Sequence, residues 1–288
     1  MSRAAEMLRR YLEQRAELGE PPLILDPRAA PAGDEPRPLE SSVPEAGTGR
    51  DGRAEARRRD TPPPSEAARS EGPPRWRKDA PPIPERGLMI APPSVDLFTE
   101  DPLARMGLEE LAECVRGCRK CELHRDRTHA VPGEGPADAK LVVVGEGPGK
   151  TEDETGRPFV GRAGELLTDI LSAIDLPREH VFICNVVKCR PPNNRKPLPT
   201  EIESCVPYLH RQLAILRPAV ILAMGGTAAE TLLNTRQSLG SLRGKVHEFR
   251  GIPLVVTYHP AALLRNPHWK KPTWDDVRIA RQLVERHD

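Results

Sequence analysis

Four consecutive apolar residues, Leu141 to Val144, are followed at once by a turn rich in glycine. A fully apolar run of this length is typical of a strand that is buried on both faces of a parallel sheet. Gly145, Gly147 and Gly149 then allow a ligand to approach the backbone at the carboxyl end of that strand. Since ligands bind at the carboxyl ends of strands in open α/β sheets, this stretch indicates both a fold class and the place of a site.

Strands and helices alternate in the rest of the carboxyl-terminal two thirds. The apolar pattern predicts further strands at 181–187, 219–224, 245–249 and 254–258. It predicts a short helix from Leu108 and longer helices at 162–174, 200–217, 227–233 and 275–286, with Thr200 and Glu203 as a capping box. This alternation indicates a three-layer α/β/α sandwich with a mostly parallel central sheet.

The amino-terminal third has a different composition. Residues 1–98 carry 17 of the 33 prolines and few aromatic residues, so they cannot bury enough apolar surface to offset the entropy of ordering. We therefore expect a short helix at 1–20 that could dock on a protein partner, a disordered linker at 21–104, and one folded domain at 105–288.

Charge and hydropathy exclude some function classes. A formal net charge of +1 gives no global sign of a nucleic-acid partner, so DNA binding would have to depend on local sites. No apolar run reaches the roughly 20 residues of a membrane span, and the first 20 residues are too charged for a secretory signal. A cytoplasmic protein without membrane contact is expected.

The six cysteines all lie between Cys114 and Cys205. Cys118 and Cys121 form a C-x2-C pair, while Cys189 and Cys205 lie far downstream, and no second C-x2-C pair completes a zinc ribbon. Four thiolates from separate segments fit an iron–sulfur cubane, although zinc stays open on spacing alone. Cys114 and Cys184 are interpreted as packing residues, and a buried core position is the alternative for Cys189 and Cys205.

Polar residues follow several of the predicted strands. Glu146 follows the first, Asn185 lies near the end of the second, and His259 follows the last. Each has an ordinary structural alternative, namely a solvated carboxylate, a satisfied amide and a core imidazole. A phosphate loop is excluded, because Val144 occupies the position where the Walker pattern requires its first glycine.

Three longer segments closely resemble the family 4 uracil-DNA glycosylases, the iron–sulfur branch of their superfamily. These segments are GEGPGKTEDETGRPFVGRAGELL, NVVKCRPPNNRKPLPTEIESC and TYHPAALLRNP. The resemblance covers about residues 108–281 and implies uracil removal from DNA at the start of base excision repair. It implies a monomer that acts in a prokaryotic cytoplasm, at the nucleoid, and a 4Fe–4S cluster held by four ligands, Cys118, Cys121, Cys189 and Cys205.

The resemblance also implies roles for the site residues. Uracil must be extruded from the duplex into a pocket, where Asn185 would read its polar edge and Phe159 would stack on its ring. His259 would donate to a uracil oxygen, with backbone N–H groups of Glu146 and Gly147 assisting, and Glu146 would position water near the sugar. Glu152 and Asn194 would hold these residues in place, and a core aromatic is the alternative for Phe159.

The segment after His259 is expected to touch DNA. Leu263 or Leu264 would fill the gap that the extruded base leaves, and Arg265 would contact a phosphate; a leucine pair within a core helix is the alternative. We also expect a local basic rim around these loops, formed by Lys188, Arg190, Arg195, Lys196, Lys270 and Lys271.

Two other functions compete with hydrolytic uracil excision. A protein of the same fold could bind uracil or damaged DNA without turnover, but intact Glu146, Asn185 and His259 argue against this. A related glycosylase with another base preference would be expected to differ at Asn185 or in the glycine-rich turn. For the cluster, a structural role that staples distant segments is more economical than redox chemistry.

Overall fold

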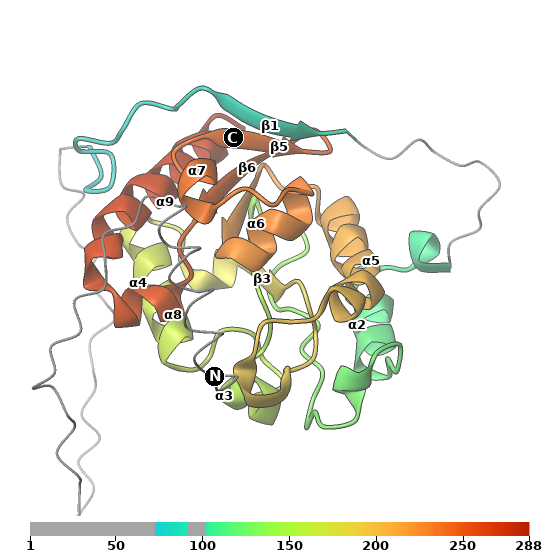
Figure 1. Cartoon of the computed structure of the whole chain (residues 1–288). Coiled ribbons are helices and arrows are strands. Elements are labelled where there is room, and N and C mark those ends of the chain that lie inside the picture. Colours follow the sequence, from blue (N-terminus) through green and yellow to red (C-terminus); the bar gives the residue numbers. More distant parts are fainter. Residues whose placement is uncertain (1–72, 92–101, 288) are drawn as a thin grey trace, which may run out of the picture. The chain divides into compact units, whose positions relative to one another are not determined.

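A six-stranded sheet forms the centre of the computed structural model, which describes residues 73–91 and 102–287 (Figure 1). The strand order is β1-β5-β6-β4-β2-β3. All neighbours run parallel except β5 and β6, which form an antiparallel hairpin. The strands are β1 (Arg86–Ile90), β2 (Leu141–Gly145), β3 (Val181–Asn185), β4 (Val220–Met224), β5 (Val246–Phe249) and β6 (Ile252–Thr257).

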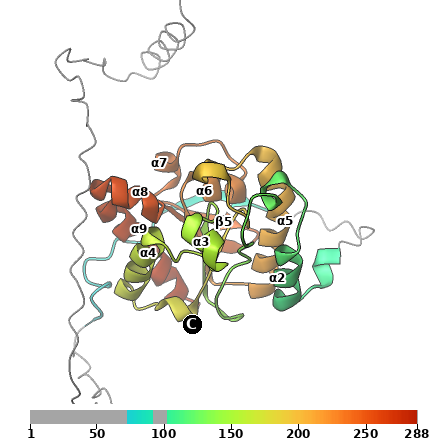
Figure 2. The same cartoon turned by 90° about the horizontal axis from the view of Figure 1, so that it is seen from below.

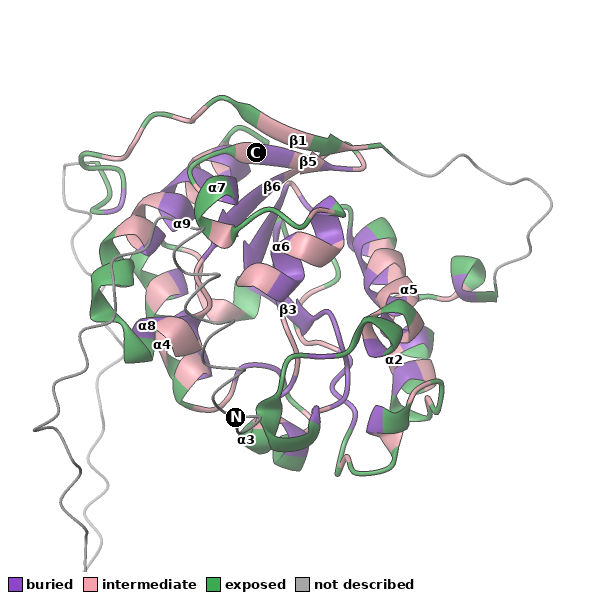
Figure 3. Cartoon of the chain, in the orientation of Figure 1, coloured by how far each residue is buried: buried purple, intermediate pink, exposed green. Residues whose placement is uncertain are grey.

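The sheet separates two hydrophobic cores because successive side chains of a strand point to opposite faces. In β2, Val142 and Val144 belong to one core, while Leu141 and Val143 belong to the other. Both pairs are fully buried, as are all five residues of β2, β3 and β4 (Figure 3). The continuous apolar run is therefore explained by helices that cover both faces of the sheet.

Helices on the two faces complete three layers (Figures 1 and 2). One core includes residues of α2 (Leu108–Arg116), α5 (Pro199–Leu216) and α6 (Gly226–Leu233). The other includes residues of α4 (Arg162–Ala173) and α9 (Lys270–Glu285). The predicted α/β/α sandwich with a mostly parallel sheet is confirmed.

Shorter helical segments connect these elements. They include α3 (Lys150–Thr155), α7 (Leu239–Leu242) and α8 (Pro260–Arg265). Single 3₁₀ turns occur at Pro102–Arg105, Glu122–His124, Arg178–His180, Pro192–Asn194 and Pro267–Trp269. No helix in residues 73–91 and 102–287 is long and apolar enough to cross a membrane.

Residues 73–91 correct the expectation that the whole stretch 21–104 is a disordered linker. Arg86–Ile90 forms the edge strand β1 beside β5. Trp76 is 1% exposed in the core with α4 and α9, and Arg278 donates to the carbonyls of Lys78 and Asp79. The composition argument was wrong here because one buried tryptophan and backbone pairing suffice to order a short proline-rich segment. The helix expected at 1–20 lies outside the described residues.

Two predicted helix starts and one strand end are also corrected. Thr200 and Glu203 do not cap α5; instead Glu201 accepts from the backbone N–H of Leu198 at 2.7 Å, so α5 starts at Pro199. Helix α9 begins at Lys270 rather than at residue 275. Strand β3 ends at Asn185, two residues earlier than expected, although Val187 still donates to the carbonyl of Glu146 at 3.1 Å.

Candidate active site and cysteine cluster

A cavity of about 580 Å³ opens where the parallel strands β2, β3, β4 and β6 reach their carboxyl ends. This volume is typical of a site for a small molecule. Its lining brings together six of the residues predicted from sequence, which are Glu146, Gly147, Glu152, Phe159, Asn185 and His259. Asn194 and Arg265 also line it.

Asn185 forms part of the cavity wall as the last residue of β3. Its side chain is 1% exposed, and no described residue donates to its Oδ1 atom. A buried polar atom without a partner is costly, so its persistence points to a ligand that completes the hydrogen bond. Gly145 makes room for this amide, because a Cβ atom there would lie 2.4 Å from Oδ1.

Phe159 also lines the cavity and has a strained backbone conformation. Its φ of 50° lies in the left-handed region that a bulky residue rarely adopts. Arg178 stabilises this turn by donating to the Phe159 carbonyl at 2.9 Å, and Gly164 allows that carbonyl a close approach. The ring is 5% exposed, and its centroid lies 5.4 Å from that of His259. Phe159 is thus both a core residue and a wall of the cavity.

His259 is held as a neutral imidazole. Its Nδ1 accepts a hydrogen bond from the backbone N–H of Ala261 at 3.2 Å, at the start of α8. Burial, reinforced by the charge of Arg265, lowers the pKa of His259 from 6.5 to about 4. Because Nδ1 is an acceptor, the ring proton resides on Nε2, which is therefore a donor.

Glu146 follows β2 and is anchored by a residue that the sequence analysis missed. The hydroxyl of Thr227, which is 2% exposed in α6, donates to its carboxylate. This contact orients one carboxylate oxygen and leaves acceptor capacity on the group. The role of Thr227 can be recognised only from the tertiary structure, where the end of β2 lies beside the start of α6. In the sequence, a threonine near a helix start is too common to indicate such a role.

Glu152 ties two turns of the cavity wall together from α3. One carboxylate oxygen accepts from the N–H groups of Val160 and Gly161, each at 2.9 Å. The other accepts from the N–H of Gly149 at 3.1 Å. The carboxylate therefore fixes the Phe159 turn against the glycine-rich turn. Asn194 has one side-chain hydrogen bond of this kind, in which its Oδ1 accepts from Nε of Arg190 at 2.8 Å.

Helix α8 separates the two leucines predicted to touch DNA. Leu263 is 1% exposed and packs inward, while Leu264 is 42% exposed and Arg265 is also exposed. Leu263 therefore cannot act as a wedge in this conformation, which leaves Leu264 available. Helical geometry alone decides this, because adjacent positions lie about 100° apart around the axis.

Lys188 does not belong to the expected basic rim. It is 1% exposed, and its Nζ donates to the carbonyl of Asn185 at 2.8 Å and to Oε1 of Gln212 at 2.6 Å. Gln212 in turn donates to the carbonyl of Pro132 at 2.7 Å. This buried lysine supports the backbone that presents the Asn185 amide, a role that the sequence did not signal.

The four predicted cluster ligands come together in a second cavity. Cys118 and Cys121 lie between α2 and the following 3₁₀ turn, Cys189 lies in the loop after β3, and Cys205 lies in α5. Burial raises the pKa of Cys121 and Cys189, and it raises the pKa of Cys205 to about 12, with neighbouring cysteines adding to each shift. In the described part of the chain, no three His, Cys, Asp or Glu side chains converge on a point suited to a metal ion.

Donors approach two of these sulfur atoms. Arg127 donates to Sγ of Cys189 at 3.0 Å, and the backbone N–H of Lys188 donates to Sγ of Cys205 at 3.3 Å. The other two cysteines are packing residues, as predicted. Cys184 is fully buried in β3, and the sulfur of Cys114 lies 3.8 Å from the hydroxyl of Tyr208.

The lining of the first cavity also includes two aromatic residues that the sequence analysis missed, Tyr258 and Trp269. Their ring centroids lie 4.5 Å apart, and their planes differ by 6°. Trp269 is 36% exposed. In a chain with 3% aromatic residues, a tryptophan beside the proposed DNA-contacting segment was an available signal.

Comparison with known proteins agrees with this geometry. Residues 132–280 match the family model described as the uracil DNA glycosylase superfamily. The type-4 uracil-DNA glycosylase of Pyrobaculum aerophilum is 49% identical over 170 residues, which cover 56% of this chain and 87% of the relative. The type-4 enzyme of Archaeoglobus fulgidus is 44% identical over 184 residues, covering 61% and 92%. The type-5 enzyme of P. aerophilum is 29% identical over 150 residues, covering 46% and 66%. The chain therefore belongs to the type-4 branch of the uracil-DNA glycosylase superfamily.

Proposed function

We propose that this protein excises uracil from DNA by hydrolysing the bond between the base and the sugar, which begins base excision repair. The observation that carries the proposal is the unpaired Oδ1 of Asn185, which is buried in a cavity that Phe159 and His259 also line. The edge of uracil offers an N–H donor beside a carbonyl acceptor, and a side-chain amide accepts and donates in the same arrangement. The type-4 relatives carry the matching name.

Uracil reaches this cavity by leaving the base stack. Flipping a nucleotide costs a few kcal/mol, part of which is regained by stacking and hydrogen bonds inside the pocket. Phe159 provides the ring for stacking. Leu264 is exposed and can occupy the vacated position in the duplex, while Arg265 contacts a neighbouring phosphate.

Cleavage of the N-glycosidic bond creates negative charge on uracil and positive charge on the sugar, and His259 and Glu146 are placed to stabilise one charge each. When the N-glycosidic bond breaks, its electron pair moves onto the uracil ring and the sugar gains positive character. The Nε2–H of neutral His259 donates to the uracil oxygen that becomes negative. Glu146, oriented by Thr227, faces the sugar and orients the water whose oxygen forms the new bond. The released proton balances the charge on the uracil.

We infer that Cys118, Cys121, Cys189 and Cys205, which all line the second cavity, would hold a 4Fe–4S cluster. Burial raises the pKa of Cys121, Cys189 and Cys205, so the charged thiolate forms need a positive charge nearby. The iron ions of a bound cluster would supply that charge. When bound, the cluster would act as a covalent staple between three distant segments. A brown protein with four irons per chain supports this assignment, whereas one zinc and no iron would remove it.

An oligonucleotide with one uracil tests the function directly. We expect wild type to leave an abasic site that alkali converts to a strand break, with the same product absent from a thymine control. Asn185→Ala and His259→Gln should each lower kcat/KM by about 10²-fold or more. Lys140→Gln, an exposed position directly before β2 at the end of that strand opposite to the cavity, serves as the control. Binding without cleavage by wild type would favour the non-catalytic reading instead.

The remaining features of the proposal concern the cellular setting. We infer a monomeric enzyme that acts on chromosomal DNA in a prokaryotic cytoplasm, with no protein partner required for the chemistry. Sedimentation of the purified protein with and without duplex DNA would test the oligomeric state.

A further inference from the structure

A stack of three planar groups borders the mouth of the uracil cavity. Trp269 lies parallel to Tyr258, with ring centroids 4.5 Å apart and an angle of 6° between the planes. The guanidinium of Arg243 lies 4.4 Å from the centroid of the Tyr258 ring. The stack therefore runs from a partly buried arginine to a tryptophan that is 36% exposed.

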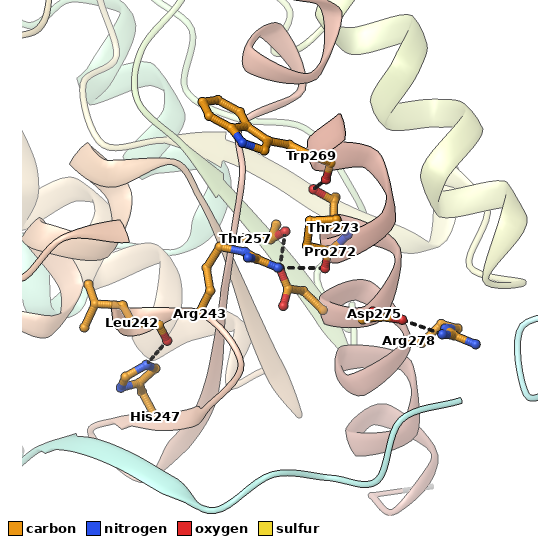
Figure 4. A network of polar contacts seen from close by, with 10 residues as sticks. Leu242, Arg243, His247, Thr257, Trp269, Pro272, Thr273, Asp275 and Arg278 are labelled. Carbon is orange, nitrogen blue, oxygen red and sulfur yellow. Dashed lines mark hydrogen bonds and ion pairs between the residues drawn. The ribbon is translucent and has the colours of Figure 1, made fainter. Parts of the chain in front are cut away.

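The base of this stack is fixed by a buried polar network (Figure 4). Arg243 donates to Oδ2 of Asp276 at 2.7 Å and to the carbonyl of Pro272 at 2.8 Å. Thr257 donates to the same carboxylate oxygen at 2.7 Å. Asp276 is 2% exposed, so its hydrogen bond with Arg243 is shielded from water and holds the guanidinium in one orientation.

The outer end of the stack is fixed as well. The hydroxyl of Thr273 donates to the backbone carbonyl of Trp269 at 2.8 Å, which holds the main chain at the start of α9, while the stacking contact with Tyr258 orients the indole ring. An exposed indole loses little conformational entropy on binding when its ring is already oriented. A rigid, exposed indole face next to a ligand cavity is suited to another planar group.

We propose that Trp269 is a stacking platform for the nucleobase that neighbours the uracil on the same DNA strand. Trp269 lines the same cavity as Asn185 and Arg265, so a strand whose uracil fills the pocket passes beside it. Exposed Lys270 and Lys271 follow immediately and supply positive charge for that strand. This inference rests on the proposed uracil excision and deepens it.

The platform acts most strongly on single-stranded DNA. In a duplex the neighbouring base is already stacked and paired, so it gains little by moving to Trp269. In a single strand the base is free, and stacking on an aromatic side chain is sequence-tolerant because every base has a π face. We therefore expect Trp269→Ala to raise KM about tenfold on a single-stranded uracil substrate and less than twofold on a duplex, with kcat unchanged on both.

Variants of two tryptophans separate stacking from general damage. Trp269→Phe keeps a ring and should stay within about threefold of the wild-type KM. Trp274→Phe, five residues later in α9, is the matched control and should match wild type. An equal loss on single strands and duplexes in Trp269→Ala, or no loss on either, would overturn the proposal.

A titration without catalysis makes the test independent of uracil excision. Uracil-free oligothymidylate added to wild type or Trp274→Phe should quench the fluorescence of Trp269, and the quench should vanish in Trp269→Phe. If wild type cleaves no uracil but this quench is present, the proposed function fails and the platform stands. If wild type cleaves uracil and no part of the quench depends on Trp269, the platform fails alone.

Discussion

Replacement of Glu152 by alanine should destabilise the protein and weaken catalysis together. The substitution removes three hydrogen bonds from the backbone N–H groups of Gly149, Val160 and Gly161 to one carboxylate. A hydrogen bond to a charged group contributes about 1.5–3 kcal/mol. The carboxylate is partly accessible to water, so the lower end applies, and three contacts give about 4.5 kcal/mol of lost unfolding free energy.

Catalysis should suffer because the Phe159 turn depends on this carboxylate. Without it, the strained residue is free to relax, and a displacement of about 1 Å in a site of this kind can cost about 10²-fold in rate. Urea unfolding followed by far-ultraviolet circular dichroism measures the stability. Steady-state cleavage of a uracil oligonucleotide measures kcat/KM, and Glu152→Gln should fall between wild type and alanine on both.

Glu154→Ala provides the matched control on the same helix. The Glu154 side chain is 55% exposed, and its ion pair with Lys150 spans 3.8 Å. A surface pair of this type contributes about 0–1 kcal/mol, so the variant should match wild type closely. The reasoning about the two turns is refuted if Glu152→Ala unfolds at the same urea concentration as Glu154→Ala and retains wild-type kcat/KM.

The other predictions concern the cavity and the amino-terminal segment. Gly145→Ala would place a Cβ atom 2.4 Å from Oδ1 of Asn185 and 2.5 Å from Cζ of Phe159, so kcat/KM should fall about 10²-fold; an unchanged value would contradict the geometry. The pKa of His259 is lowered from 6.5 to about 4, so the neutral ring, whose Nδ1 accepts from Ala261, persists as pH falls through 6.5, and the acid limb of kcat/KM due to this residue should have its midpoint near 4. A midpoint near 6.5 that disappears in His259→Gln would show that the ring is not held neutral. Trp76→Ala should lower the free energy of unfolding by about 3–5 kcal/mol with little change in KM, measured by urea unfolding, and no destabilisation would argue against the docking of residues 73–91.

Local patterns were sufficient for much of the fold. The apolar run Leu141–Val144 identified a central strand, because a strand covered on both faces needs no polar position. Alternation of strands and helices then predicted the layers and placed the site at the carboxyl ends of the strands. Glu146, Asn185 and His259 were noticed because each lies at or just after the end of a predicted strand, although β3 ends at Asn185 rather than at residue 187, and their roles came from the family resemblance.

Tertiary structure decided what depends on contacts between distant segments. The sequence left Leu263 and Leu264 equivalent, and the packing of α8 buried the first and exposed the second. It placed Lys188 on the surface, whereas the meeting of β3 with α5 buried this lysine beneath Asn185.

By itself, then, the sequence determined the chemistry that is available, because residue types and their order fix which donors, acceptors and thiols follow each strand. Only the tertiary structure decided their orientation and burial. It left Oδ1 of Asn185 unpaired, fixed the tautomer of His259 and stacked Trp269 on Tyr258. The physical reason is that the hydrogen-bond partners of a side chain and its burial depend on which distant segments pack around it. A single strand motif in the sequence contains no information about those segments.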